Sequence, residues 1–396
     1  MASRTGRCGT RATLDTAEAA RSSTFSFVVR ALQPAAAMPT MTDLLREAAE
    51  RQASDLHLSS GEPPFLRVHG DLTRTESAAL DPATVLTLVH SIMTPAQRER
   101  YAAEHEIDFA TQLDGLGRYR VNAFQHGRGP GVVLRTIPTV VPSLDTMEFP
   151  PILKELCTRE RGLILVTGPT GSGKSTTLAA MVDQINQTRR VNIVTIEDPI
   201  EMVHQDRLSL IHQREVGEDT GGFAEALRRV LRQDPDVILI GEMRDRPTID
   251  AALKAGETGH LVLSTLHTLD AAETINRVLD FYPGGLQRRV RLTLASTLRG
   301  IISQRLLPRA DGSGRVVAAE VLVNTERVSE RISDPELTVE IPDVIAQGSY
   351  YGMETFDQSI LRLFAAGTIT FAEGLRHATK PADLRLRAQQ LGLIPT

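Results

Sequence analysis

The stretch Gly168-Pro169-Thr170-Gly171-Ser172-Gly173-Lys174-Ser175 decides the fold of this 396-residue chain. It fits the phosphate-loop pattern, in which a glycine and four further residues precede Gly-Lys-Ser/Thr. A continuous apolar run, Leu163 to Val166, comes before the loop, and a segment with few helix breakers, Thr176 to Val182, follows it. Buried strand, glycine-rich turn and helix in this order predict an α/β domain that binds a nucleotide.

The loop predicts a site for the phosphates of ATP together with Mg²⁺. Its glycines let backbone N–H groups surround a phosphate, and the N-terminus of the following helix adds partial positive charge. Lys174 would reach the β- and γ-phosphates, and the Ser175 hydroxyl would bind Mg²⁺. We expect these residues to bind the nucleotide: Gly168, Pro169, Thr170, Gly171, Ser172, Gly173, Lys174, Ser175 and Thr176.

Composition excludes several classes of protein. Lys and Arg number 44 against 49 Asp and Glu, so the formal net charge is −5 and the chain lacks the basic footprint of a nucleic-acid-binding protein. Two cysteines, Cys8 and Cys157, cannot build a disulfide framework or a four-cysteine zinc site. No stretch approaches the roughly 18–20 apolar residues of a membrane span. We expect a protein of the reducing cytoplasm without a transmembrane segment.

Four regions follow from the pattern of the chain. Residues 1–40, rich in Ala, Ser, Thr and Arg, are expected to be a disordered or non-native extension, with a targeting peptide as the alternative. Residues 41–138 alternate short strands with helices that begin at prolines, which predicts a smaller α+β domain. Residues 139–150 contain prolines without hydrophobic period and are interpreted as a linker. Residues 151–396 alternate strands and helices, which predicts a parallel sheet with helices on both faces and a C-terminal helical subdomain.

Polar side chains follow several strands of this second sheet. In such sheets ligands bind beyond the carboxyl ends of the strands, so Glu201, Glu242 and His267 are expected at the same edge as Lys174. Hydrolysis of a phosphoanhydride needs a residue that orients water, and Glu242, just past its strand, is predicted to do this. With Ser175, the two glutamates form the predicted Mg²⁺ set, directly or through water.

Glu201 is predicted to hold the water molecules of the metal ion or to position the attacking water. Glu197 and Asp198 precede it in the same loop and are rival candidates for that role.

Two histidines lie at the two sides of another predicted apolar strand, residues 260–264. His260 and His267 lie seven residues apart, which does not fit a zinc pair at i and i+4 on a helix. We interpret them as sensors of the γ-phosphate, with a structural role as the alternative.

Two arginines are expected to face each other across a hairpin. A turn near Arg128 brings Arg120 close to Arg135, and neighbouring like charges cost energy unless an anion lies between them. They are predicted to act as arginine fingers, and the alternative is a pair of solvated arginines on an exposed face.

Five segments, with the phosphate loop, resemble one family: the type IV pilus retraction ATPases, or PilT family of secretion-superfamily motors. Residues 196–201 look like its Asp box, 236–245 like its Walker B motif, and 257–267 like its His box. Residues 54–58 and 118–124 are also similar, and the resemblance runs from about 41 to 375.

The resemblance implies a PAS-like domain before a RecA-like ATPase domain, and a ring-shaped homohexamer that binds ATP between domains. Arg120 and Arg135 match the family's arginine positions, Glu242 its catalytic glutamate, and Glu201 its Asp-box glutamate. Hydrolysis would drive pilus depolymerisation, and thus twitching motility, at the inner face of the cytoplasmic membrane. The implied partners are a platform protein of that membrane and sister pilus ATPases.

Other functions remain open. Residues 327–333 lack the Ala-Ile-Arg-Asn-Leu-Ile-Arg motif that retraction ATPases often carry, so an accessory retraction ATPase is an alternative. Pilus assembly and type II secretion ATPases usually have a four-cysteine zinc module, which two cysteines cannot form. A RecA-like nucleic-acid motor is disfavoured by the acidic balance and the absence of Trp. A further alternative is a nucleotide-gated switch that hydrolyses little.

Overall fold

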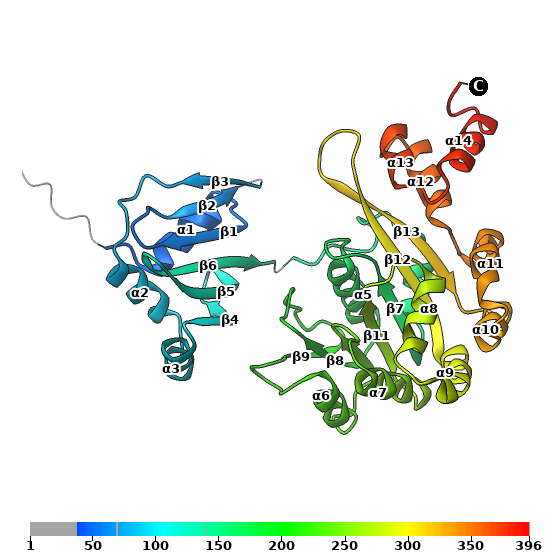
Figure 1. Cartoon of the computed structure of the whole chain (residues 1–396), viewed down its shortest axis with the longest axis horizontal. Coiled ribbons are helices and arrows are strands. Elements are labelled where there is room, and N and C mark those ends of the chain that lie inside the picture. The colour runs from blue at the N-terminus through cyan, green and yellow to red at the C-terminus, as the bar shows by residue number, and fades with distance from the viewer. Residues whose placement is uncertain (1–37, 69, 139, 396) are drawn as a thin grey trace, which may run out of the picture. The chain divides into compact units, whose positions relative to one another are not determined.

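The computed structural model describes residues 38–68, 70–138 and 140–395 (Figure 1). The expected extension therefore lies outside the described residues, apart from its last three positions. The described chain forms two β-sheets, each with its own hydrophobic core. The predicted class is confirmed, because an α/β domain follows a smaller α+β domain. Among the described residues, no helix has both the length and the apolar character of a membrane span.

The first sheet has six strands in the order β3-β2-β1-β6-β5-β4, and every neighbouring pair is antiparallel. Its strands are β1 (Asp55–Ser59), β2 (Phe65–Val68), β3 (Asp71–Arg74), β4 (Glu106–Leu113), β5 (Gly117–His126) and β6 (Gly129–Ile137). Its helices are α1 (Met41–Glu50), α2 (Pro82–Ser91) and α3 (Pro95–Glu104). Alternate side chains of β5, such as Val121 and Ala123, are fully buried in its core, as the alternation predicts.

Helix caps set the starts of these helices. Asp81 and Thr94 accept hydrogen bonds from the first turns of α2 and α3, and proline is the first residue of each helix, as predicted. Helix α1 has a side-chain cap as well. Thr40 is the cap, and Asp43 is the third helical residue, whose carboxylate closes a capping box on Thr40.

The second sheet has seven strands in the order β13-β12-β7-β11-β10-β8-β9. Its strands are β7 (Gly162–Thr167), β8 (Asn192–Glu197), β9 (Leu210–Glu215), β10 (Val237–Ile240), β11 (Leu261–Leu266), β12 (Leu298–Pro308) and β13 (Arg315–Val323). The helices are α4 (Ile152–Cys157), α5 (Lys174–Thr188), α6 (Phe223–Val230), α7 (Arg246–Glu257), α8 (Ala271–Asp280), α9 (Gly284–Thr297), α10 (Glu326–Ser333), α11 (Ile341–Gln347), α12 (Phe356–Ala365), α13 (Phe371–His377) and α14 (Pro381–Gln390). Two short 3₁₀ helices span Thr338–Glu340 and Ser349–Tyr351.

One strand of this sheet departs from the predicted parallel arrangement. β13 runs antiparallel to β12, and all other neighbours are parallel. The reason is the short connection, residues 309–314, because a turn of this length joins only antiparallel strands. The two strands form a long hairpin (Figure 1).

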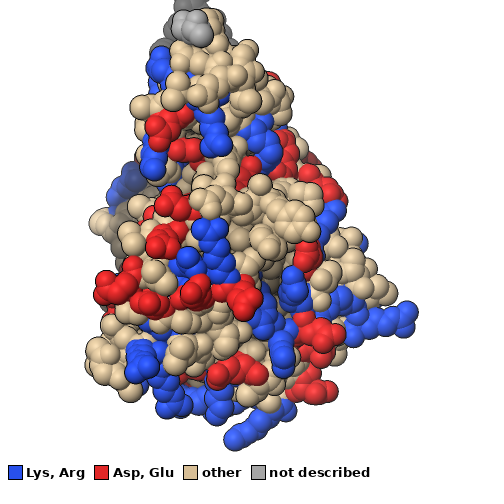
Figure 2. Space-filling view, turned by 90° about the vertical axis from the view of Figure 1, so that its right-hand side faces the viewer, with Lys and Arg blue, Asp and Glu red and all other residues tan. Residues whose placement is uncertain are grey.

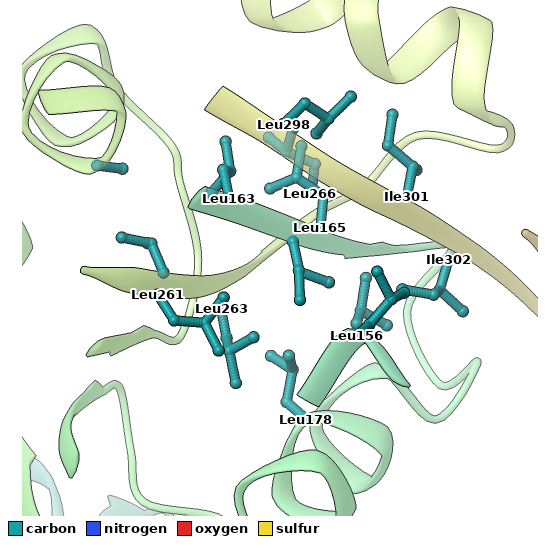
Figure 3. Packing of buried hydrophobic residues seen from close by; sticks show 14 of the residues in the cluster. Leu156, Leu163, Leu165, Leu178, Leu261, Leu263, Leu266, Leu298, Ile301 and Ile302 are labelled. Carbon is teal, nitrogen blue, oxygen red and sulfur yellow. The ribbon is translucent and has the colours of Figure 1, made fainter. Parts of the chain in front are cut away.

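Leucines and isoleucines fill the core between the second sheet and its helices. Leu263 of β11 and Ile302 of β12 lie on the face of the sheet that holds Leu178 of α5 and Leu156 of α4 (Figure 3). Leu163 and Leu165 of β7 point to the opposite face, together with Leu298 and Ile301. Strands buried on both faces explain the continuous apolar runs of the sequence.

The predicted linker contributes to this core. Its described residues contain no helix or strand, but Leu144 is only 3% exposed and Phe149 packs against the same core. Part of the segment is therefore anchored on the second sheet.

Helices α12 to α14 pack on the β12–β13 hairpin and bury a separate small core. The members of this core are Leu307, Val316, Ala318, Ile360, Leu363, Ile369 and Leu384. The hairpin thus forms one edge of the sheet and also holds the C-terminal helices.

Candidate active site

A pocket of about 550 Å³ lies at the carboxyl ends of the central strands of the second sheet. Lys174 and Ser175 line it together with Glu201, Glu242 and His267. The structure therefore brings these predicted residues to one place. Their positions follow from topology, because each comes from the phosphate loop or from a segment directly after β8, β10 or β11.

The phosphate loop has a backbone that depends on glycine. Gly168 has φ of +140°, and a Cβ atom there would lie 2.6 Å from the carbonyl oxygen of Gln304. Gly171 and Gly173 have φ of +80° and +91°, in the left-handed region that favours glycine. No other residue fits position 168 without displacing β12.

The hydrogen bonds of the loop's polar side chains are few. The Ser172 hydroxyl is buried and has no hydrogen-bond partner among the described residues. Lys174 Nζ donates only to the loop's own carbonyl oxygens, at 2.9 Å to Gly168 and 3.1 Å to Pro169. Unsatisfied donors beside a helix N-terminus form a binding site for an anion such as phosphate.

Two carboxylates act on this lysine. Burial lowers the pKa of Lys174, and the negative charges of Glu242 and Glu201 oppose that shift. The ammonium group and both glutamates thus lie within electrostatic reach of one another.

Glu242 is held on both sides of its carboxylate. Its Oε2 lies 2.8 Å from Nε of Arg244, and its Oε1 lies 3.3 Å from Nε2 of His267. The backbone before it is fixed to both neighbouring strands: the Gly241 N–H donates to Ile196 at 2.8 Å, and the Gly241 carbonyl accepts from the Thr265 hydroxyl at 2.7 Å. The side chain is therefore presented from a rigid support.

Glu201 lies in the loop between β8 and β9, which Gln213 of β9 holds. The Gln213 side chain donates to the Met202 carbonyl at 2.8 Å and to Glu197 Oε1 at 3.1 Å, and it accepts from the His204 N–H at 2.8 Å. Glu197, Asp198 and Glu201 all line the pocket, so lining alone does not separate the rivals.

The hydrogen bonds of Glu197 do separate it from Glu201. Burial raises the pKa of Glu197, and hydrogen bonds from Thr195 and Gln213 oppose the shift. Its Oε1 atom accepts both of these bonds and so holds the loop in place.

The structure does not place His260 in this pocket. His260 precedes β11 and His267 follows it, and a strand of six residues spans about 20 Å. The Nδ1 atom of His260 lies 3.1 Å from the Ala255 carbonyl oxygen instead. The two histidines therefore lie at opposite ends of β11, and of the two only His267 lines the pocket.

The two predicted arginines belong to the first sheet and do not line this pocket. Arg120 and Arg135 are direct partners in the β5–β6 ladder, so the predicted register is confirmed. Each has a carboxylate nearby: Arg135 Nε lies 2.7 Å from Asp55, and Arg120 lies 4.0 Å from Asp108. Carboxylates of the same sheet therefore offset the repulsion between the two arginines, so no bound anion is needed for that purpose.

Several lining residues were missed by sequence reasoning: Arg244, His204, Phe223, Leu306 and Arg315. Arg244 had a signal, because it lies two residues after Glu242 in the same strand-end segment. Leu306 and Arg315 had none, since only the antiparallel hairpin brings them beside the phosphate loop.

The acidic and histidine side chains do not form a metal cage. In the ranges that the structure describes, no three His, Cys, Asp or Glu residues are grouped so as to hold an ion. A Mg²⁺ ion that keeps its waters and binds substrate phosphates needs only one or two protein ligands. The donor set of the pocket, a hydroxyl and carboxylates, is compatible with such an ion.

Comparison with known proteins identifies similar chains. Residues 31–364 match the family model of the Type II/IV secretion system protein. The type IV pilus retraction ATPase PilT of Pseudomonas aeruginosa is 46% identical over 343 residues, which cover 87% of this chain and 99% of the relative. The type IV pilus ATPase PilU of the same organism is 41% identical over 343 residues, which cover 87% of this chain and 90% of PilU.

A solved structure is also similar. The crystal structure of the pilus retraction motor PilT with bound ADP matches with a TM-score of 0.82 at 41% identity. The match covers 88% of this chain and 99% of that chain.

Proposed function

The chain belongs to the Type II/IV secretion system protein family, and we propose that it is an ATP-hydrolysing motor that powers retraction of type IV pili. The observation that carries this proposal is the pocket itself. It joins a phosphate loop to a glutamate, Glu242, that is fixed between a histidine and an arginine. Similarity to PilT along 87% of the chain supplies the biological setting.

The order of the strands supports one orientation of ATP in the pocket. β7, which carries the phosphate loop, lies between β12 on one side and β11 and β10 on the other. We propose that the γ-phosphate points toward Glu242 and His267. The nucleoside then lies on the side of Leu306 and Arg315.

Mg²⁺ fits the hydroxyl of Ser175, with Glu201 and Glu242 as its partners through water. When bound, the ion neutralises charge that develops on the phosphates. Lys174 contributes a second positive charge from the loop.

Glu242 orients the attacking water. The water oxygen forms a bond to the γ-phosphorus while the bond to the bridging oxygen breaks, and the products are ADP, phosphate and a proton. His267 holds the other oxygen of Glu242 and reports the presence of the γ-phosphate. Glu201 orders water around the metal.

Arg120 and Arg135 complete the site when ATP is held between the two domains of a homohexamer. Positive charge from a second domain makes turnover depend on domain closure. Hydrolysis is then coupled to movement of one domain against the other. The motor would act at the inner face of the cytoplasmic membrane, through a platform protein and alongside sister pilus ATPases such as PilU.

The decisive experiment is deletion of this gene alone, followed by counts of surface pili and a twitching assay. More pili with lost motility supports retraction. Loss of pili indicates an assembly ATPase, and unchanged pili with weaker retraction under load indicates an accessory motor.

A biochemical assay addresses the other classes. The purified protein should hydrolyse ATP without stimulation by DNA or RNA, and bound nucleotide without turnover would indicate a switch. Acidic and basic side chains are interspersed on the face shown in Figure 2, which disfavours broad nucleic-acid binding there.

A further inference from the structure

A second pocket, of about 210 Å³, lies between β13 and helices α11, α12 and α14, which are on the right of Figure 1. It shares no lining residue with the nucleotide pocket. Pockets for drug-sized ligands begin at roughly 300 Å³, so this one suits a single side chain or a small molecule. The proposed ATPase function assigns it no role.

The inner wall of this pocket combines a carboxylate with apolar surface. Glu320 of β13 is 8% exposed, Phe356 of α12 is 2% exposed, and Leu384 of α14 is 3% exposed. A ligand that fills this wall therefore needs a polar head beside an apolar part, because a polar group buried without a partner is unfavourable.

Glu320 has no counter-ion. Its Oε1 atom accepts a hydrogen bond from the Ala271 N–H at 2.9 Å, and no lysine or arginine of the described chain forms an ion pair with it. The charge of Arg305 acts on Glu320, but its guanidinium donates instead to the His377 carbonyl at 2.6 Å and to the Thr379 hydroxyl at 3.2 Å. A bound cation would supply the missing counter-charge.

The rest of the lining also favours a cation. Three further carboxylates and two basic side chains line the pocket: Asp343, Asp357, Asp383, Lys380 and Arg387. In the part of the chain that the structure describes, none of these five side chains takes part in an ion pair. With Glu320, four carboxylates stand against two cations, so the lining is complementary to a positively charged ligand and not to an anion.

We propose that this pocket is a binding site for an alkylammonium or alkylguanidinium group, the chemistry of a lysine or arginine side chain and of a small free amine. The charged head pairs with Glu320, and the alkyl stem lies on Phe356 and Leu384, as the stems of long basic side chains lie on apolar surface. The site goes beyond the proposed ATPase function and does not depend on it.

The carboxyl group of Glu320 gives this site a pH signature. Burial raises its pKa to about 7, nearby Asp270 and Asp357 add to this, and the Ala271 N–H and Arg305 oppose it. Among the described residues, no histidine lines the pocket. The cation takes the place of the proton, so binding strengthens as pH rises. The ionised fraction of a group with this pKa grows from roughly one-tenth at pH 6 to roughly nine-tenths at pH 8, which predicts about a tenfold gain in affinity.

The test titrates the full chain with four probes and follows binding by saturation-transfer NMR at about pH 6 and pH 8. Three probes are charged: Nα-acetyl-lysine N-methylamide, Nα-acetyl-arginine N-methylamide and 1-aminobutane. The fourth, Nα-acetyl-norleucine N-methylamide, has the alkyl stem without the charge. The proteins are the original chain, E320Q and the matched control E336Q, because Glu336 is exposed and does not line the pocket.

We expect saturable binding of charged probes at pH 8, at least about tenfold tighter than that of the norleucine amide. In the original protein and in E336Q, affinity should fall about tenfold from pH 8 to pH 6. E320Q should bind at least about tenfold more weakly at pH 8 and should lose the dependence on pH. Tighter binding of the two basic amides than of 1-aminobutane indicates a protein side chain as the natural ligand, and the reverse order indicates a free amine.

Three results would overturn the proposal. The first is no saturable binding of any charged probe. The second is equal affinity for the lysine and norleucine amides, which would mean that the pocket reads only the alkyl stem. The third is E320Q with the affinity and pH dependence of the original protein.

A variant that does not fold leaves the proposal testable. If E320Q is unfolded, constant affinity of the original protein from pH 6 to pH 8 would exclude Glu320 as the counter-charge. D383N, a change on the exposed rim, should then lower affinity by about two- to threefold. Failure of the proposed function is a separate matter, since none of these measurements contains ATP.

Discussion

His267 Nε2 lies 3.3 Å from Glu242 Oε1, although 25 residues separate the two positions in the chain. They meet because β10 and β11 are adjacent parallel strands, with Ile240 directly opposite Ser264. Glu242 follows its strand by two residues, and His267 follows directly after β11. The pair is thus a product of strand register, and it brings an imidazole and a carboxylate together at the pocket.

Removal of the carboxylate charge should stop hydrolysis without loss of binding. We expect kcat of E242Q to fall about 10²–10⁴-fold, the usual contribution of a positioned general base. ATP should remain bound, because Lys174 and the loop are intact. Rapid-quench turnover and filter binding of ATP measure the two effects, and persistent turnover would contradict the role of Glu242.

The two histidines provide a matched pair for the same site. H267A should lower kcat about tenfold or more. H260A should leave kcat nearly unchanged, because His260 lies at the other end of β11, away from the pocket. An equal loss in both variants would restore the expectation that the sequence raised for His260.

Substitution of Arg120 should separate function from stability. Its contact with Asp108 is 4.0 Å long between half-exposed side chains, so R120Q should change the free energy of unfolding by less than about 0.5 kcal/mol. If Arg120 is an arginine finger, kcat should nevertheless fall at least about tenfold. Urea unfolding and ATP turnover on one preparation check this, and unaltered kcat would leave Arg120 as a surface residue.

Arg135 should behave differently, because it also stabilises its own domain. Burial acts to raise the pKa of Asp55, but hydrogen bonds from Arg135 and Ser54 outweigh it and leave that pKa lowered. R135Q removes the 2.7 Å partner of a carboxylate that is only 3% exposed. We expect a loss of about 1–2 kcal/mol in unfolding free energy together with any loss of turnover.

Truncation of Arg315 should weaken nucleotide binding and spare chemistry. The residue lines the pocket from β13, on the side of the phosphate loop away from Glu242. We expect R315A to raise KM for ATP about tenfold, while kcat stays within about threefold. Binding of inorganic tripolyphosphate should not change, because it has no nucleoside. A fall in kcat at constant KM would mean that Arg315 acts at the γ-phosphate of ATP and not at its nucleoside.

Stability should depend on pH through Glu320, which is 8% exposed. Burial raises its pKa to about 7, nearby Asp270 and Asp357 add to this, and the Ala271 N–H and Arg305 oppose it. The native state holds this proton more tightly than the unfolded chain, whose pKa is near 4.5. The contribution of Glu320 to stability is therefore greatest below the unfolded pKa and is lost as pH rises toward about 7, by about 3 kcal/mol in total.

E320Q should remove this dependence, because the amide stays neutral and can still accept from the Ala271 N–H. Urea unfolding at about pH 5 and pH 8 should show a smaller difference for E320Q than for the original protein. The exposed Glu336 provides the control, and E336Q should retain the original slope. Identical slopes in all three proteins would exclude Glu320 as the source.

Local signals predicted much of the fold. Conformational preferences that depend on neighbouring residues were enough for the phosphate loop and the strands after it. They were also enough for helices α2 and α3, which begin at prolines. The direction of β13 could not be read, because Val316 to Val323 is an apolar run like any buried strand. Only the short connection to β12 reveals that it is antiparallel.

The sequence predicted those pocket residues whose positions depend on one strand alone. Glu201, Glu242 and His267 lie within four residues of the carboxyl ends of β8, β10 and β11, so the rule for carboxyl ends was enough. Placement of His260 required the exact start of β11, a boundary that sequence patterns locate poorly. Arg315 required the pairing of two strands, which no local pattern contains.

Adjacent leucines in β12 face different neighbours. Leu306 lines the nucleotide pocket, and Leu307 belongs to the small core beneath α12 and α14. Because successive side chains of a strand point to opposite faces, one peptide unit separates the nucleotide from the C-terminal helices. A nucleotide in this pocket that displaced Leu306 would therefore also act on Leu307, the next residue of β12, and through it on the small core of the C-terminal helices.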